Sequence, residues 1–377
     1  MSGAPKKRWK YWLRLTLSLG LSALFLYLAV ASLGTCPSGA DCIEGRCTVV
    51  SGVCSAERPC QSCVDWSNLP AQLRDVSLSS IIVFSVFFLL VHATRLVRWY
   101  YLLRPLGLKR FYPALHAGAI GLAAIIVIPL RLGEFVRPYL IARDTEVPLP
   151  AALGTAVVER VIDGLSVTLL LFVTLATVQT RADEPAVVWT AGIISAGIFG
   201  TVMAVLLFSW WQREATIRVL RRFGNVFSEG LTEKALGLLE GFLDGVASLR
   251  AGGDLYQFLS WTVLYWIINA LSLVYLANAF GLELGWWEGF AVMSMLVIGI
   301  MVPGGPGHIG TFEFFLQTSL GLFVAVNEMP ERVLAFVATL HVLQFLVQVL
   351  FGIPFWLVDG VTGRRARLRR LATAQEA

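Results

Sequence analysis

Long apolar segments recur between residues 13 and 357, and they constrain the fold more than any other feature of the sequence. Backbone N–H and C=O groups in lipid must be satisfied by a helix or a closed barrel. The segments lack the alternation that a strand shows, and several are long enough to cross a bilayer as helices. Because 56% of the residues are hydrophobic and only 15% are charged, a soluble fold is excluded. The sequence predicts an all-α, polytopic transmembrane helical bundle.

The positions of Lys and Arg predict how the bundle is oriented. Basic residues cluster at 6–14, before the first apolar segment, and at 364–370, after the last one. Such clusters mark the cytoplasmic side, so both termini are expected in the cytoplasm beneath a bacterial inner membrane. Arg95, Arg98 and Arg104 are interpreted in the same way, as the cytoplasmic flank of a second crossing. No nucleic-acid partner is expected, since juxtamembrane basic residues serve topology and contact anionic lipid.

The N-terminal part of the chain predicts an anchor followed by a cysteine-rich loop. Residues 1–33 form a retained anchor helix, because the apolar run is longer than the core of a signal peptide. Residues 34–76 then form a periplasmic or extracellular loop, which the clustered cysteines mark as disulfide-stapled. A metal site is the less favoured alternative, since no histidine lies nearby, and neither a metal nor a cofactor is expected. The six cysteines are Cys36, Cys42, Cys47, Cys54, Cys60 and Cys63.

Two helices of the region 77–360 are predicted to be broken. Apolar pieces at 114–128 and 135–142 flank a Pro/Gly break, and pieces at 288–302 and 311–326 flank another. A helix of about 15 residues spans about 22 Å, less than the roughly 30 Å of hydrocarbon. We therefore expect about six full crossings plus two oppositely oriented re-entrant helical hairpins, although each hairpin could be two short crossings. Opposed broken helices are typical of transporters with a midplane site. Residues 361–377 form a basic cytoplasmic tail.

Charged residues recur at helical spacing beside the first break. Arg131, Glu134 and Arg137 share one helix face, so that two guanidinium groups bracket one carboxylate and leave donors for a phosphate. Glu159, Arg160 and Asp163 form a second cluster on the following crossing. Charges inside a membrane are costly and favour a function, but a purely structural ion-pair network is the alternative for both clusters.

The second break, 303–310, is rich in glycine. Gly304, Gly305 and Gly307 allow bare backbone to approach a ligand beside a helix N-terminus, with Glu313 in the first turn. His308 could titrate near neutrality and link transport to protons. The alternative is that the glycines only permit the sharp turn. His341, Gln344 and Gln348 share a face of the last crossing, where interhelical hydrogen bonding is the ordinary explanation.

Three motifs carry a resemblance to a known family, and in chain order they are Pro129-x-Arg131-x-Gly133-Glu134-x-x-Arg137, Glu159-Arg160-x-x-Asp163 and Pro303-Gly304-Gly305-Pro306-Gly307-x-x-Gly310-x-x-Glu313. Over about 77–360 the chain resembles the lysylphosphatidylglycerol synthase transmembrane-region family, also called flippase-like. The resemblance implies a membrane module that moves aminoacylated phospholipids or other lipid-linked groups between leaflets.

We therefore expect a lipid flippase or lipid-linked transporter whose partner is a membrane lipid. Its substrate residues would be Arg131, Glu134, Arg137, Glu159, Arg160, Asp163, Gly304, Gly305, Gly307, His308 and Glu313. The chain is expected not to be an enzyme, because about 19 residues after the last crossing are too few for an aminoacyl-transferase domain.

Two other interpretations stay open. One is a membrane enzyme acting on a lipid-linked sugar or phosphate, with Glu134, Glu159 or Asp163 as general base. The other is a non-transporting assembly partner that binds a periplasmic protein through residues 34–76. A homo-oligomer is compatible with each.

Overall fold

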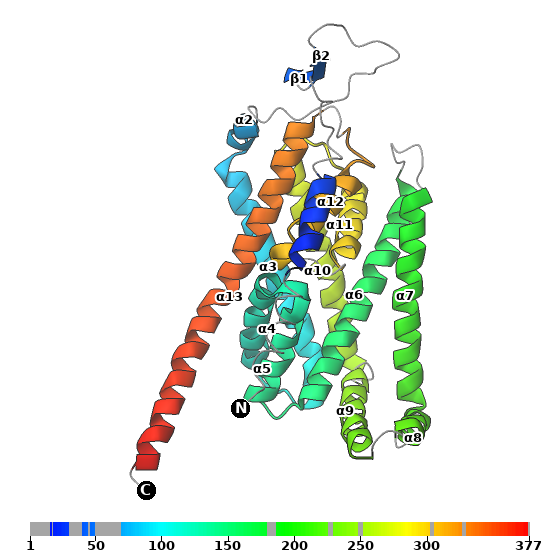
Figure 1. Cartoon of the computed structure of the whole chain (residues 1–377), viewed down its shortest axis with the longest axis vertical. Helices are drawn as coiled ribbons and strands as arrows, with labels where there is room; N and C mark the ends of the chain where they lie inside the picture. Colours follow the sequence, from blue (N-terminus) through cyan, green and yellow to red (C-terminus); the bar gives the residue numbers. More distant parts are fainter. Residues whose placement is uncertain are drawn as a thin grey trace.

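The computed structural model describes residues 16, 18–29, 40–43, 46–49, 69–178, 186–224, 229–247, 252–301, 305–325 and 329–375. Gly304, the side chain of Arg131 and the side chains of all six cysteines lie outside this description, so the predictions that rest on them stay predictions. The described part of the chain is an α-helical bundle of membrane type, as predicted, with one short β-hairpin at its upper end (Figure 1).

The elements follow one another along the chain in the following order. The N-terminal part contains the helix Ser18–Ala29, β1 (Ala40–Ile43), β2 (Arg46–Val49) and α2 (Leu69–Arg74). The bundle continues with α3 (Leu78–Leu103), η1 (Arg104–Leu106), α4 (Phe111–Val127), η2 (Pro129–Phe135), α5 (Val136–Asp144), α6 (Leu149–Thr177) and α7 (Ala186–Trp211). The second half contains α8 (Arg213–Gly224), α9 (Glu229–Ala247), α10 (Gly252–Ala279), α11 (Trp286–Ile300), η4 (Pro306–His308), α12 (Thr311–Leu320) and α13 (Pro330–Gln375).

Four of the described helices are long and apolar enough to cross a membrane. They cover Leu78–Leu106, Gly192–Trp211, Gly252–Ala279 and Glu331–Gly360. Helix α6 has a comparable length of 29 residues and carries the charged cluster of Glu159, Arg160 and Asp163. The number of six full crossings stays a prediction.

The chain breaks where the sequence predicts. Ile128 ends α4 in an extended conformation, as a residue before proline prefers, and Pro129 then begins η2. The turn folds tightly back on α4, because a Cβ on Gly133 would overlap the backbone carbonyl of Ala124. Helices α4 and α5 lie side by side in the lower half of the bundle, and α11 and α12 lie side by side in the upper half (Figure 1). That arrangement is compatible with two opposed hairpins, whose re-entrant path stays a prediction.

The N-terminal helix packs on the second break. The backbone N–H of Gly305 donates to Ser22 Oγ at 2.9 Å, and a Cβ on Gly310 would overlap the carbonyl of Ser22. Phe25 adds ring contacts with Phe314 and Phe315, at 5.5 and 5.8 Å between centroids. The helix is therefore part of the bundle and lies against the glycine-rich turn.

Helices α8 and α9 follow α7, and α9 packs against α6. Its apolar face is buried on α6, where Gly154 and Gly245 meet so closely that either Cβ would overlap the opposite backbone. Leu236, Leu243 and Val246 are buried there. Small residues at the crossing permit this close packing, which a helical wheel cannot show.

The apolar core is interrupted at mid-height. On α3, Phe88 and Val91 belong to an upper hydrophobic cluster and Trp99 and Leu102 to a lower one. On α6 the same change falls between Val161 and Val167. Polar and charged residues such as Arg98 and Asp163 lie between the two clusters, and they form the site described next.

Candidate functional site

A buried ion-pair network joins α3, α5 and α6 between the two hydrophobic clusters. Arg98 of α3 donates to both carboxylate oxygens of Asp163, at 2.5 and 2.7 Å, and to Glu159 Oε1 at 2.7 Å. Nη2 of Arg137 on α5 lies 2.5 Å from Glu159 Oε2. This contact is an ion pair that does not have the geometry of a hydrogen bond. Glu159 and Arg98 are fully buried. A guanidinium fork facing a carboxylate is the strongest pairing that proteins offer, which makes these charges tolerable inside the bundle.

Aromatic rings and one glycine set the positions of the two arginines. The Arg98 guanidinium lies 4.5 Å from the centre of the Tyr265 ring, and that of Arg137 lies 4.7 Å from the Trp99 ring. Such cation–π contacts favour a desolvated guanidinium. Gly121 of α4 leaves room for Arg137, since a Cβ there would lie 2.6 Å from Arg137 Cβ.

Arg160 and Glu134 lie at the accessible edge of this network. Arg160 Nε is 3.7 Å from Glu134 Oε2, and Arg160 Nη1 is 3.7 Å from Asp163 Oδ2. Their side chains are 23% and 24% exposed, whereas Glu159 beside them is fully buried. A third contact, 3.9 Å from Arg160 to Glu159, links the edge to the buried network. The pair therefore connects the surface with the interior.

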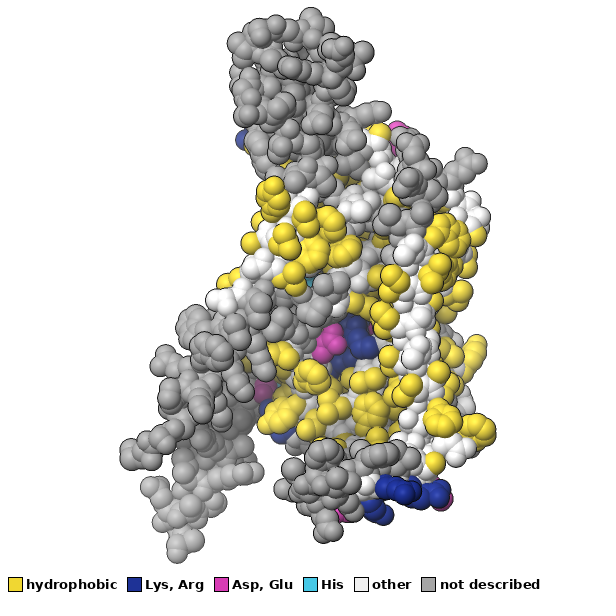
Figure 2. All heavy atoms as spheres, turned by 45° about the vertical axis from the view of Figure 1, so that its right-hand side comes forward, with side chains coloured by type: hydrophobic (Ala, Val, Ile, Leu, Met, Phe, Trp, Pro, Cys, Tyr) yellow, Lys and Arg dark blue, Asp and Glu magenta, His cyan; other side chains and the backbone are white. Residues whose placement is uncertain are grey.

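A polar cavity of about 120 Å³ adjoins the network. Side chains from both halves of the chain line it, and the polar ones are His92, Arg95, Arg160, Asp163, Tyr265, Asn269, His308, His341, Gln344 and Gln348. Figure 2 shows acidic and basic side chains together at mid-height, in a surface that is otherwise hydrophobic there. A volume of this size holds several waters or the polar end of a headgroup, while acyl chains would have to stay outside.

The charges of the layer formed by the cavity and the adjoining network do not balance. Among the described residues the layer holds four arginines, Arg95, Arg98, Arg137 and Arg160, against the three carboxylates Glu134, Glu159 and Asp163. Arg95 lines the cavity, and no described carboxylate forms an ion pair with it. The excess of positive charge favours an anionic ligand.

The glycine-rich turn forms part of the cavity wall. Gly307 and His308 line the cavity, whereas Gly305 and Gly310 approach Ser22 of the N-terminal helix. Glu313 accepts from the N–H of Gly310 at 2.7 Å and contacts His341.

The structure thus brings most of the predicted substrate residues close together and places others beside them. Glu134, Arg137, Glu159, Arg160 and Asp163 form one network, and Gly307 and His308 face the same cavity. Their role at a substrate stays a prediction.

The interpretation of Arg95 and Arg98 as a cytoplasmic flank is wrong, because Arg98 is fully buried and Arg95 lines the cavity. Helix α3 continues to Leu103 beyond them. The signal that could have found them is their spacing of three residues, which places both on one helix face.

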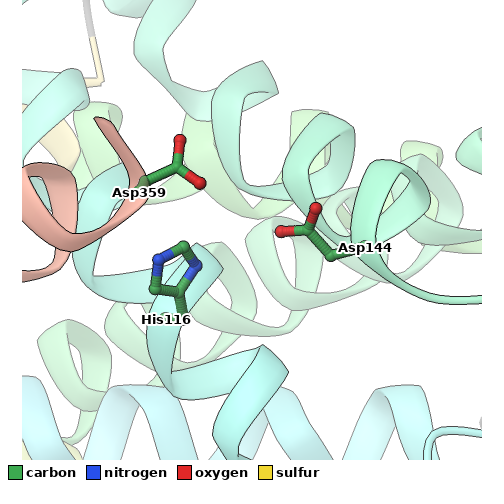
Figure 3. Close-up of side chains that lie close together, drawn as sticks. All are labelled: His116, Asp144 and Asp359. Atoms are coloured by element: carbon green, nitrogen blue, oxygen red, sulfur yellow. The ribbon is translucent and has the colours of Figure 1, made fainter. Parts of the chain in front are cut away.

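A second polar cluster lies where α4, α5 and α13 meet. His116, Asp144 and Asp359 offer ligand atoms within 4.8 Å of one another (Figure 3). Arg143 already binds both carboxylates, at 2.6 and 2.8 Å to Asp144 and at 2.5 and 3.1 Å to Asp359. The guanidinium supplies the positive charge that a metal would supply, so the cluster acts as an ion-paired link between α5 and α13.

Fold and site together define an integral membrane helical protein with a cationic polar cavity between two broken helices. The chain belongs to the family described as lysylphosphatidylglycerol synthase TM region, whose model matches residues 61–352. This confirms the family that the three motifs indicate.

A relative named "Glycosyltransferase AglD", from Haloferax volcanii, is 23% identical over 322 residues. The match covers 77% of this chain and 50% of the relative, so the chain spans about half of that protein's length. No solved structure matches. The relative contradicts the expectation that the chain is not an enzyme, because its name is that of a glycosyltransferase.

Proposed function

We propose that this protein moves a lipid with an anionic headgroup between the leaflets of its membrane. The observation that carries the proposal is the cavity at mid-height, which is lined by Arg95, Arg160 and Asp163 and adjoins a network with more described arginines than carboxylates. A charged headgroup cannot cross hydrocarbon without such a polar path, because an unpaired charge at the bilayer centre is costly. Membership of a lipid-related membrane family supports the proposal.

The contacts divide the arginines into two roles. Arg98 and Arg137 are paired with Glu159 and Asp163 inside the bundle, so they hold the site in shape. Arg95 and Arg160 face the cavity, and Arg160 keeps only long contacts of 3.7 to 3.9 Å with its carboxylates. We assign the headgroup phosphate to Arg95 and Arg160, with Arg131 as a further donor from the first break. Glu134 would compete with the phosphate for Arg160 and so help to release the phosphate.

Proteoliposomes test the proposal directly. The purified protein is reconstituted with fluorescently labelled phosphatidylglycerol, and a membrane-impermeant quencher reports the labelled lipid that reaches the outer leaflet. A hydrogen bond to a charged group contributes about 1.5–3 kcal/mol. Arg95→Gln and Arg160→Gln are therefore expected to slow translocation by roughly 10-fold or more if the arginines stabilise the crossing headgroup.

Arg104→Gln is the matched control, because Arg104 adjoins the end of α3 but is 46% exposed and pairs with Asp254. It should leave translocation unchanged. Equal rates for wild type, Arg95→Gln and Arg160→Gln would contradict the assigned roles, and an inactive wild type would remove the proposal itself.

The orientation of the chain is also a proposal. We place both termini in the cytoplasm of a bacterial cell and the cysteine loop outside, on the basis of the basic clusters at 6–14 and 364–370. Labelling of intact cells with a membrane-impermeant thiol reagent after mild reduction tests the loop. Absence of label would contradict the outside placement of the cysteine loop and favour the opposite orientation.

The second candidate is an enzyme that modifies a lipid-linked sugar or phosphate, and the glycosyltransferase name of the relative favours it. Glu134 is the best-placed general base, since it is 24% exposed beside Arg160 while Glu159 is buried between two arginines. Incubation of the purified protein with lipid-linked sugar donors, analysed by mass spectrometry, tests this function. A new product that Glu134→Gln abolishes would support it.

A further inference from the structure

His341 of α13 bridges two elements that wall the cavity. Its Nδ1 lies 2.5 Å from Glu313 Oε1 of α12, and its Nε2 lies 2.6 Å from the carbonyl oxygen of Gly307. The second carboxylate oxygen of Glu313 accepts the N–H of Gly310 at 2.7 Å. The His341 ring also stacks on Phe312 at 4.3 Å, so its orientation is fixed by packing as well as by hydrogen bonds.

A count of donors shows that both contacts of His341 can be hydrogen bonds only if the pair carries an extra proton. A neutral imidazole carries one N–H, and both partners of His341 are acceptors if Glu313 is ionised. With one N–H, a lone pair of the ring would face an oxygen at 2.5 or 2.6 Å. Either His341 is an imidazolium that donates twice, or Glu313 is protonated and donates to Nδ1. In both cases the pair binds one proton more than a neutral histidine beside a carboxylate.

The pair is in contact with the cavity. The side chains of His341 and Glu313 are only 12% and 18% exposed, and His341 lines the cavity directly. Water in the cavity would give protons access to the ring. The other titratable or charged groups that face the same space are His92 and Arg95 of α3, Arg160 and Asp163 of α6, Tyr265 of α10 and His308 of η4.

We propose that Glu313 and His341 form a proton-binding site that couples lipid movement to protons, which rests on the proposed translocation. Loss of the proton places two lone pairs against each other, so one of the two contacts must open. If the Gly307 contact opens, the turn carrying η4 separates from α13. If the Glu313 contact opens, α12 separates from α13. Either event loosens the wall of the headgroup cavity, and reprotonation restores it.

The chain offers an isosteric test. In Glu313→Gln the amide can donate to His341 Nδ1 while its oxygen still accepts from Gly310, so the protonated arrangement is kept without a titrating carboxyl. Glu288→Gln is the matched control, because Glu288 accepts the N–H of Gly285 at 2.6 Å in the same capping geometry at the start of α11. His341→Gln removes the other half of the pair.

The first readout is the leaflet distribution of labelled phosphatidylglycerol under an imposed gradient of two pH units. One proton coupled to one lipid allows a leaflet ratio of up to about 100-fold, since each pH unit corresponds to tenfold. Wild type and Glu288→Gln should build up an asymmetry of at least several-fold. Glu313→Gln should move lipid without any asymmetry.

The second readout does not depend on transport. Infrared difference spectra of the purified protein between pH 5 and 9 should show titration of the pair in wild type and Glu288→Gln, and its loss in Glu313→Gln and His341→Gln. Absence of this titration in wild type would overturn the proton site. Lipid movement without gradient-driven asymmetry would overturn the coupling but keep the translocation. A titrating pair in a protein that moves no lipid would remove the proposed function and the coupling, and would keep the proton site.

Discussion

Replacement of Glu159 by Gln removes the central negative charge of the buried network while keeping the shape of the side chain. Glu159 is fully buried and contacts Arg98 at 2.7 Å, Arg137 at 2.5 Å and Arg160 at 3.9 Å. In the variant, two carboxylates remain for the four arginines of the layer. Removing one partner of a buried ion pair lowers the free energy of unfolding by about 3–5 kcal/mol, because the remaining charge is left buried without compensation.

Thermal unfolding in detergent measures this cost. A destabilisation of 1 kcal/mol lowers the Tm of a domain of 150–250 residues by about 2–4 °C, and by less in a larger one. We therefore expect Glu159→Gln to lower the Tm by roughly 5–15 °C. Asp254→Asn is the matched control. The ion pair of Asp254 with Arg104 has the same 2.7 Å length as that of Glu159 with Arg98, but the Asp254 side chain is 22% exposed and the Arg104 side chain is 46% exposed. An exposed ion pair contributes about 0–1 kcal/mol to stability, so the Tm of the control variant should hardly change.

The double variant Glu159→Gln with Arg137→Gln completes the test. Removing the Arg137 charge as well should restore part of the lost stability, since fewer uncompensated charges remain buried. Equal Tm values for Glu159→Gln and Asp254→Asn would refute the reasoning, because they would mean that Glu159 is hydrated or neutral in the folded protein. Failure of the double variant to recover would instead show that Arg137 stabilises the fold mainly through its contact with the Trp99 ring.

Three further predictions concern the rest of the fold. Gly245→Ala should destabilise the protein by about 1–3 kcal/mol in the same thermal assay, because its Cβ would overlap the Ala151 carbonyl, whereas Gly237→Ala on the same helix meets open space and should be neutral or stabilising. Arg143→Gln should change the stability by less than about 1 kcal/mol, because its side chain is 38% exposed, and a large loss would show that the link to Asp359 is more protected than its exposure indicates. Thiol titration of the denatured, non-reduced protein should find no free thiol among the six cysteines, and six after reduction; free thiols before reduction would contradict the disulfide-stapled loop.

The sequence alone determined the class of the protein and the places where its helices break. Apolar segments without strand alternation leave only helices, because lipid offers no other partner for the backbone. Pro129 forces Ile128 out of the helical conformation, and the structure ends α4 at that point. The motifs with Glu134, Arg137 and Asp163 also identified the charged layer, since these residue types are rare inside a membrane without a reason.

The tertiary structure decided which charges meet and which face the cavity. Arg98 and Asp163 are 65 residues apart in sequence, and His341 and Gly307 are 34 apart, so no local periodicity could pair them. Arg95 and Arg98 were misread for this reason, because the sequence shows neither the carboxylates of α6 that reach Arg98 nor the cavity that Arg95 lines. The rotation of each helix about its axis, set by close contacts such as Gly154 with Gly245, fixes those pairings, and only the packed bundle contains that information.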